Sequence, residues 1–538
     1  MPSKPALTPS SSRISTWLDP PTKFSMFRTT SELPATADLA IIGSGFSGAS
    51  VAYHALKAYP ALSIVMLECW VTSSNTDICL GESGRNGGHI RPDFYTYASQ
   101  ITAKYGSEEA ARLNKFERDD FEAVKRLIKE DSVDCETVED GESWQVFLTQ
   151  EEFDEALREF TMMRDLGGDV HDIQVYMRNE AIGVTGIQGC FGAIVSPGSR
   201  ISPTKLSHTK VLHVALNNCN DATQYSSGDC VSDYSELDEF EHLDMNALRI
   251  VPKKSSYVHK ITTSRGTLLA NKVVHATNAY IDTLLSISSN VRDTTKSPNG
   301  VVLVTPIRSH ALEIASVGIR RKLSLDPSHN ITNMNFNRGG EYLIQRPNGN
   351  FVLGGGRRFG NGNGIESFNN NTTAETEIDG SVDFYLSFFF PQILCFDNSH
   401  YLSPPKTVLG ERDTNEAYSA DYGIVKQWTG IMGFSVDEYP LVGKIPSFLE
   451  QGQEYCIAGF SGHGMPRIFL AAKALVRMIL LEDDDYRYDC QYHSTVGPMH
   501  YRYIEGTIEV AENVQLPQCF AITEERLTKM ISLAKRKE

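Results

Sequence analysis

One short segment limits the folds open to this chain more than any other. Residues 37–42 form an apolar run, and Gly43-Ser44-Gly45-Phe46-Ser47-Gly48 follows directly. Residues 49–59 then have helical character, and a second apolar run at 63–67 ends in Glu68. A strand, a glycine turn, a helix, a strand and an acid in this order are typical of a βαβ unit that binds a dinucleotide. We therefore predict an α/β fold built on a Rossmann-like parallel sheet.

The three glycines and the acid have separate roles in such a unit. Gly43 permits the tight turn, Gly45 lets the backbone approach a pyrophosphate, and Gly48 lets the helix pack closely on the strand. The helix N-terminus offers N–H groups and the positive end of its dipole to the phosphates. Glu68 follows Gly48 by twenty residues and can accept hydrogen bonds from a ribose. The motif predicts a dinucleotide but does not separate NAD from FAD.

Composition excludes several other classes of protein. The chain has 538 residues, of which 41% are apolar and 22% charged, as in ordinary globular proteins. Fifty basic against 67 acidic residues give a net charge of −17, so we expect neither a nucleic-acid partner nor binding to an anionic membrane. Residues 217–245 hold eight acids and no Lys or Arg, which favours a solvated insertion.

Targeting and metal signals are missing from the sequence. Residues 1–28 lack the apolar core of a signal peptide, and the apolar stretch at 468–481 is too short to span a bilayer. The C-terminal residues Lys535–Glu538 are not a peroxisomal signal, so a cytoplasmic location is expected by elimination. No C-x-x-C or H-E-x-x-H is present, and we expect neither a metal site nor a disulfide framework.

Periodic patterns place further elements along the chain. Charged and apolar residues alternate at helical spacing in 107–130 and 150–165, and 468–481 also reads as a helix. Strand character is present at 257–280, 301–307, 341–346 and 351–353, and one amphipathic helix is expected near 523–536.

Three more segments are rich in glycine and small polar residues, at 81–89, 273–280 and 458–465. By composition alone the first is a surface loop, the second a core strand, and the third a glycine turn opening a helix. Their order after the βαβ unit resembles the FAD-dependent amine and amino-acid oxidases of the D-amino-acid oxidase superfamily. Residues 83–88 are most similar to the gamma-glutamylputrescine oxidase branch, and residues 17–34 to its fungal members.

This resemblance covers about residues 17–482 and implies a cofactor, a division into domains and a set of contacts. The cofactor would be FAD, and the second domain would carry a mixed or antiparallel sheet over the flavin. The implied cofactor residues after Glu68 are Ser83, Arg85, Asn86, Gly87, Gly88, His89, Ala276, Thr277, Asn278, Gly433, Gly459, Phe460, Ser461, Gly462, Gly464 and Met465. The implied domains are a leader (1–36), a flavin domain (37–100, 191–300 and 406–482), a substrate domain (101–190 and 301–405) and a tail (483–538).

The activity implied by the resemblance is removal of hydride from a carbon next to nitrogen. Water would hydrolyse the imine, and oxygen would take the electrons as hydrogen peroxide. Arg91 stands near the position of a substrate-carboxylate arginine, so it and His463 in the terminal loop are the candidate catalytic residues. The chemistry of arginine suits a bidentate carboxylate clamp, although a surface ion pair remains an equal alternative.

Departures from the family pattern keep other interpretations open. No Cys occurs in 426–435 and His89 is displaced from the family's histidine, so we expect FAD to be held without a covalent bond. Val352 stands in place of a lysine that speeds reaction with oxygen, and Pro466 in place of a carboxylate-binding lysine. A flavin dehydrogenase, or an oxidase tailoring a secondary metabolite, therefore remains an alternative, as does a non-catalytic flavin-bound protein.

Overall fold

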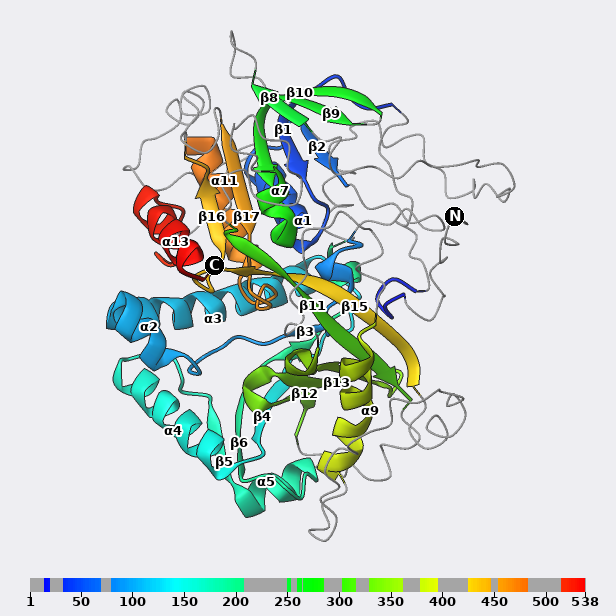
Figure 1. The fold of residues 1–538 in the computed structure, drawn as a ribbon, viewed down its shortest axis with the longest axis vertical. Helices are drawn as coiled ribbons and strands as arrows, with labels where there is room; N and C mark the ends of the chain where they lie inside the picture. Colours follow the sequence, from blue (N-terminus) through cyan, green and yellow to red (C-terminus); the bar gives the residue numbers. More distant parts are fainter. Residues whose placement is uncertain are drawn as a thin grey trace, which may run out of the picture.

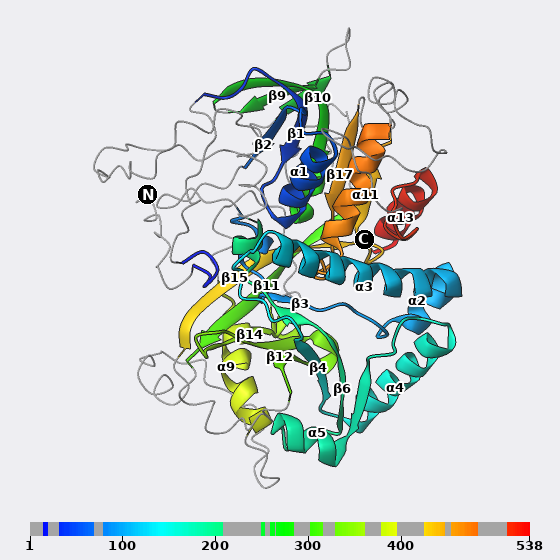
Figure 2. The ribbon, with the colours of Figure 1, turned by 180° about the vertical axis from the view of Figure 1, so that it is seen from behind.

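The computed structural model describes most of the chain between residues 14 and 537. The described ranges are 14–19, 32–68, 79–207, 249–252, 259–263, 265–284, 302–315, 329–360, 378–394, 424–446, 453–481 and 514–537. The acidic segment 217–245 lies outside them. Two sheets organise these residues, and helix α3 (Ser107–Glu130) crosses between them (Figures 1 and 2).

The first sheet contains the predicted βαβ unit. Strand β1 (Thr36–Ile42) pairs in parallel with both β10 (Gly266–His275) and β2 (Ile64–Leu67). Strand β17 (Glu454–Ala458) pairs in parallel with the other edge of β10. Antiparallel strands complete this sheet, namely β16 (Leu441–Lys444) beside β17, and β9 (His259–Thr263) and β8 (Arg249–Pro252) beyond β10. The predicted α/β architecture with a parallel sheet is confirmed.

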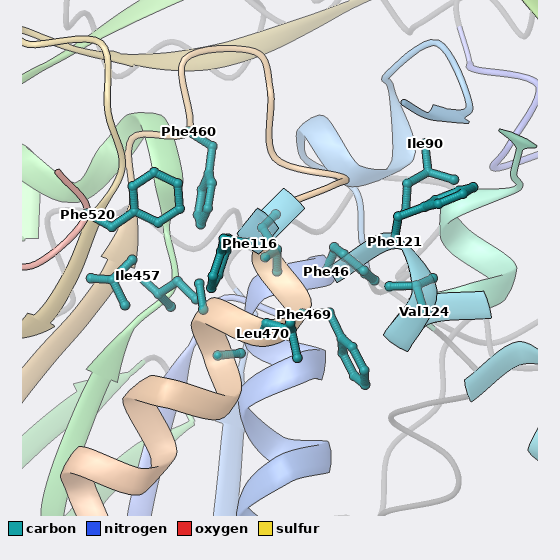
Figure 3. Packing of buried hydrophobic residues seen from close by; sticks show 14 of the residues in the cluster. Phe46, Ile90, Phe116, Phe121, Val124, Ile457, Phe460, Phe469, Leu470 and Phe520 are labelled. Carbon is teal, nitrogen blue, oxygen red and sulfur yellow. The ribbon is translucent and has the colours of Figure 1, made fainter. Parts of the chain in front are cut away.

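Two helices cover one face of this sheet. Helix α1 (Phe46–Ala58) packs on α11 (Ile468–Leu481), and α3 also contacts α11. Phe46, Phe116 and Phe469 bring these helices into one apolar cluster, which Phe520 closes against Phe116 with ring centroids 5.5 Å apart (Figure 3). Full burial of one such side chain contributes roughly 1.5–3 kcal/mol, so the cluster fixes α1 and α11 relative to each other.

The second sheet has eight strands and mixed direction. In spatial order they are β15 (Ile424–Ser435), β11 (Val304–Ile314), β14 (Phe351–Gly355), β13 (Glu341–Gln345), β12 (Ile331–Phe336), β4 (Glu142–Phe147), β6 (Gly192–Pro197) and β5 (Gln174–Met177). Only β12 and β4 run parallel, and every other neighbouring pair is antiparallel. The predicted mixed or antiparallel second sheet is confirmed.

Further helices and short elements accompany the two sheets. The helices are α2 (Ala98–Tyr105), α4 (Gln150–Asp165), α5 (Arg178–Thr185), α7 (Ile281–Leu284), α9 (Gly380–Leu394) and α13 (Glu524–Lys537), and the short elements include η2 (Glu82–Gly84), β3 (His89–Ile90), β7 (Ser199–Arg200), η4 (Asn278–Tyr280), η5 (Asn337–Gly339) and η6 (Arg357–Phe359). The helices predicted at 107–130, 150–165, 468–481 and near 523–536 are confirmed. Among the described helices, none is long and apolar enough to cross a membrane.

Two strands of the second sheet fall within the residue ranges predicted for the flavin domain. Residues 424–435 fall in the expected flavin domain, yet β15 pairs with β11 along the edge of the second sheet. Residues 192–197 also fall there, yet β6 lies between β4 and β5. Long-range strand pairing decides both placements, and sequence patterns do not report such pairing.

Candidate functional site

The glycine turn after β1 forms a compact cradle. Gly43 has a φ of +105°, and its N–H donates to the carbonyl oxygen of Leu67 at 2.8 Å. A Cβ atom on Gly48 would overlap the carbonyl oxygen of Gly43, so the helix can start this close to the turn only with glycine. Ser44 donates from its N–H and its hydroxyl to one carboxylate oxygen of Glu68, at 3.1 and 2.6 Å. Glu68 is therefore fixed beside the turn.

The N-terminus of α1 suits an anionic group. Its N-cap is Gly45, which provides no capping side chain, and no acidic residue occupies the first turn. The positive end of the helix dipole is therefore not offset locally, which is the arrangement that favours a phosphate. The N–H of Phe46 donates to Ser83 Oγ at 2.8 Å, which joins the cradle to the next predicted segment. The residues present fit the pyrophosphate of a dinucleotide.

The predicted segment 83–89 lies between the cradle and the second sheet. Arg85 is buried, and its guanidinium donates to the carbonyl oxygens of Leu80 at 2.8 Å and Thr429 at 3.2 Å. The side chain of Asn86 accepts a hydrogen bond from Gly88 N–H at 2.8 Å, which stabilises the turn. At Gly87 the ring of Tyr342 from β13 packs against the backbone. The Arg85 side chain is therefore committed to contacts inside the protein.

The other two predicted segments meet directly. Asn278, with φ of +45°, accepts hydrogen bonds at its Oδ1 atom from the N–H groups of Gly459 at 3.0 Å and Phe460 at 3.3 Å. Ser461 N–H donates to the carbonyl oxygen of Gly433 in β15 at 2.7 Å. The N–H of Ala276 bonds to the carbonyl oxygen at the end of β1, at 2.8 Å. The structure thus brings the four predicted segments together around the carboxyl ends of β1, β10 and β17.

The terminal loop is tied to helix α3 by a buried carboxylate. Glu117 is fully buried, and its Oε2 atom lies 3.0 Å from His463 Nε2. Its Oε1 atom accepts from Arg467 Nε at 2.7 Å, and the N–H of Asp93 donates to Oε2 at 2.5 Å. Burial alone would raise the pKa of Glu117, but the charges of Arg467 and His463 outweigh it and lower the pKa to about 2. Glu117 is therefore ionised, and it contacts both the Arg467 guanidinium and the His463 imidazole.

Sequence reasoning missed Glu117, although a signal was present. Within α3, Leu113, Glu117 and Phe121 follow one another at a spacing of four, so the glutamate falls on the apolar face. An acid at such a position requires a buried partner. Arg467 is this buried partner, and it lies against Glu117.

His89 and Arg91 lie at the C-terminal end of segment 83–89. Burial, Arg91 and His463 together lower the pKa of His89 to about 3, so its imidazole is neutral. Its ring centroid lies 5.2 Å from that of Tyr342. Within the described residues, no carboxylate forms an ion pair with Arg91, and its Nε atom is buried without a hydrogen bond. Arg91 therefore carries a positive charge that the described protein does not neutralise by pairing.

Two further arginines flank the second sheet and behave differently. Arg346 is committed to the protein, because its guanidinium contacts Glu136 at 3.1 Å and Glu313 at 3.2 Å. Arg357 instead lies over the ring of Phe434, 4.6 Å from its centroid, and burial lowers its pKa against an opposing effect of Tyr97. Arg357 is thus a second cation facing aromatic groups beside the terminal loop.

Comparison with known proteins decides the family. The model of the FAD dependent oxidoreductase family matches residues 38–217 and 240–478. The chain belongs to this family. FAD is accordingly its cofactor, and the residues of the cradle described above suit its pyrophosphate.

Individual relatives are more distant. Gamma-glutamylputrescine oxidoreductase of Escherichia coli is 30% identical over 114 residues, which is 21% of this chain and 25% of that protein, so the match spans only a quarter of the relative's length. The crystal structure of glycine oxidase from Geobacillus kaustophilus superposes with a TM-score of 0.55 at 16% identity, covering 83% of this chain and 95% of that one. L-proline dehydrogenase from P. horikoshii gives a TM-score of 0.55 at 15% identity, with 85% and 99% covered. At these identities the two structures establish the fold.

Proposed function

We propose that this flavoenzyme oxidises the C–N bond of an amine or amino acid to an imine, which water then hydrolyses. FAD, when bound, supplies the redox chemistry by accepting the hydride equivalent. The observation that carries this proposal is Arg91, a cation without a carboxylate partner among the described residues, placed beside the segment that fits the flavin. The partial similarity to gamma-glutamylputrescine oxidoreductase supports an amine substrate.

In this proposal Arg91 binds the substrate's carboxylate and orients the reacting carbon. A guanidinium clamps a carboxylate through two parallel hydrogen bonds, which fixes both position and angle. His89 stays neutral beside it, so it adds no competing charge and leaves Arg91 as the local cation. Arg357 and Phe434 offer a second cationic and aromatic surface for the remainder of the substrate.

The terminal loop has a different role in the same proposal. The backbone from Gly462 to Met465 precedes α11, whose first turn contains no acidic residue. Its dipole would stabilise negative charge that develops on the reduced cofactor. His463 is held by Glu117 at 3.0 Å, which favours a positioning role for this residue over proton abstraction.

A flavin dehydrogenase is the second candidate, and position 352 favours it. Val352 is fully buried in β14 within an apolar cluster that includes Trp17 and Trp428. It provides no positive charge of the kind that would assist oxygen. In this candidate the electrons therefore leave to another acceptor, as they would in an oxidoreductase that tailors a secondary metabolite. The rate of flavin reoxidation in air against that with a dye acceptor separates oxidase from dehydrogenase.

The substrate assignment is tested with Arg91→Gln. We expect KM for a carboxylate-bearing amine to rise about 100-fold, which corresponds to the loss of one buried charge pair, and KM for the decarboxylated analogue to change less than twofold. Arg164→Gln, which removes an exposed pair with Asp165 at the end of α4, is the matched control and should leave both values unchanged. An equal rise for both substrates with Arg91→Gln would contradict the carboxylate role.

We also propose that FAD is bound without a covalent link. Residues 426–435, which form most of β15, contain no cysteine, and the imidazole of His89 is enclosed beside Tyr342. Acid precipitation of the loaded protein should therefore release all of the flavin into the supernatant. Flavin that stays with the precipitate, and is released only when His89 is replaced, would contradict this expectation.

A further inference from the structure

We propose that the N-terminal segment Ser15–Leu18 is part of the apparatus that holds FAD, acting as a positioning element behind segment 83–88. The sequence predicted only an irregular leader here. The backbone is irregular, but all four side chains are buried, with exposed fractions of 0, 7, 5 and 3%. A terminal segment so completely enclosed has been ordered at a cost in conformational entropy, and its contacts must offset that cost.

Those contacts converge on the backbone of segment 83–88. Ser15 donates its hydroxyl hydrogen to the carbonyl oxygen of Gly84. Trp17 donates from Nε1 to the carbonyl oxygen of Asn86 at 2.7 Å, and its ring packs so closely on Gly88 that any side chain there would overlap it. The Ser15–Leu18 segment therefore fixes both the position and the conformation of this stretch of backbone.

A second tryptophan acts on the adjacent peptide. Trp428 of β15 donates from Nε1 to the carbonyl oxygen of Arg85, also at 2.7 Å. Trp17 and Trp428 belong to one buried cluster with Ile344 and Val352 of the second sheet. Two consecutive carbonyl groups are thus each held by an indole, one from the N-terminal segment and one from the sheet. The turn is held between them and cannot shift without breaking a buried hydrogen bond.

The turn in its place contacts the cofactor cradle directly. Ser83 Oγ accepts the N–H of Phe46 at 2.8 Å, at the first residue of α1. A Cβ atom on Gly45 would lie 2.9 Å from that same oxygen, so Ser83 occupies the space beside the glycine turn. Displacement of Gly84–Gly88 would therefore move Ser83 and, through it, the start of the helix that fits the phosphates.

The N-terminal segment is itself anchored on its far side. Thr204 donates its hydroxyl hydrogen to the carbonyl oxygen of Trp17 at 2.7 Å. Arg346 donates to Thr16 Oγ1 at 2.5 Å and lies 4.9 Å from the centroid of the Trp17 ring. Because these contacts hold the segment in place, its own hydrogen bonds fix the position of segment 83–88.

The test measures FAD affinity rather than turnover, so it does not depend on the substrate proposed above. The apoprotein is titrated with FAD, and quenching of flavin fluorescence gives the dissociation constant. Trp17→Phe keeps an aromatic side chain but removes the N–H donor and the part of the indole that packs on Gly88. We expect the dissociation constant to rise about tenfold in this variant and about threefold in Ser15→Ala. Trp144→Phe is the matched control, because that buried indole donates to Glu142 at 2.8 Å in β4, and its value should stay within twofold of wild type.

Urea unfolding of the apoproteins separates positioning from general stability. Positioning predicts that Trp17→Phe and Trp144→Phe lose similar stability while only Trp17→Phe loses FAD affinity. FAD affinity within twofold of wild type in both Trp17→Phe and Ser15→Ala would overturn the proposal, since the segment would then serve folding alone. If Trp17→Phe does not fold, Ser15→Ala decides by the same criterion.

Discussion

The Nε2 atom of His463 lies 3.0 Å from Oε2 of Glu117, although 346 residues separate the two in sequence. The other oxygen of this carboxylate receives Arg467, also at short distance, 2.7 Å. One buried glutamate of α3 therefore holds both the glycine loop and the residue immediately before α11. The geometry of the terminal loop is thereby linked to α3, a helix outside the βαβ unit that forms the cradle.

Replacing Glu117 with Gln should reduce the free energy of unfolding by about 3 kcal/mol at pH 7, because Arg467 would remain buried without its carboxylate. The folded pKa of Glu117 is about 2 against an ordinary 4.5, so its contribution is present above pH 4.5 and is lost as the pH falls toward 2. Urea unfolding at pH 7, 5 and 3 measures both effects. If the free energy of unfolding falls equally in wild type and variant between pH 5 and 3, the lowered pKa of Glu117 is contradicted.

The close approach at Gly48 predicts a large effect from one methyl group. Gly48→Ala should destabilise the apoprotein by about 3 kcal/mol and abolish FAD binding, because the added atom overlaps the backbone of Gly43. Gly183→Ala in α5 is the control, since nothing lies within 4 Å of its Cβ position. This variant should raise the free energy of unfolding by about 0.5–1 kcal/mol. Denaturant titration and FAD fluorescence report both. Normal FAD affinity in Gly48→Ala would refute the cradle.

The two hydrogen bonds accepted by Asn278 predict a contrast between two variants. Asn278→Ala should lower the free energy of unfolding by about 2 kcal/mol, because the N–H groups of Gly459 and Phe460 lose their acceptor. Alanine also tolerates the φ of +45° poorly. Asn278→Asp keeps the acceptor and should stay within about 0.5 kcal/mol of wild type. Thermal unfolding with and without FAD compares them, and similar losses in both variants would show that the acceptor is unimportant.

His89 should make the apoprotein acid-sensitive at mild pH. Its folded pKa is about 3 against an ordinary 6.5, so the unfolded chain binds the extra proton and stability falls as the pH drops below 6.5. Between pH 6 and 4.5, the free energy of unfolding of His89→Asn should fall less steeply than that of wild type, by up to about 1.4 kcal/mol per pH unit. An unchanged slope in His89→Asn would contradict burial of this ring in neutral form.

Local patterns anticipated much of the fold. The helices at 107–130 and 150–165 begin and end where the sequence placed them, because charged and apolar residues alternate there with helical period. Thr149 also provides a normal N-cap, accepting Glu152 N–H at 3.2 Å. The βαβ unit was equally accessible, since its glycines and Glu68 lie within one continuous stretch of chain.

The site was less predictable where it depends on residues distant in sequence. Nothing in residues 14–19 indicates that Trp17 reaches Asn86, because the contact requires both sheets to be in place. The role of Arg85 was also hidden, since its partners Leu80 and Thr429 are carbonyl oxygens that any residue could provide. Glu117 lay within reach of sequence reasoning, and its position on an apolar face was the signal.

An amine or amino acid is expected to transfer electrons to FAD held in this cradle. Anaerobic addition of a panel of amines, N-methyl amino acids and amino acids to the FAD-loaded protein, followed by its absorption spectrum, tests for this transfer. We predict that at least one of them bleaches the flavin band, with one carbonyl product formed per flavin. If dithionite bleaches the band and no member of the panel does, this expectation is contradicted.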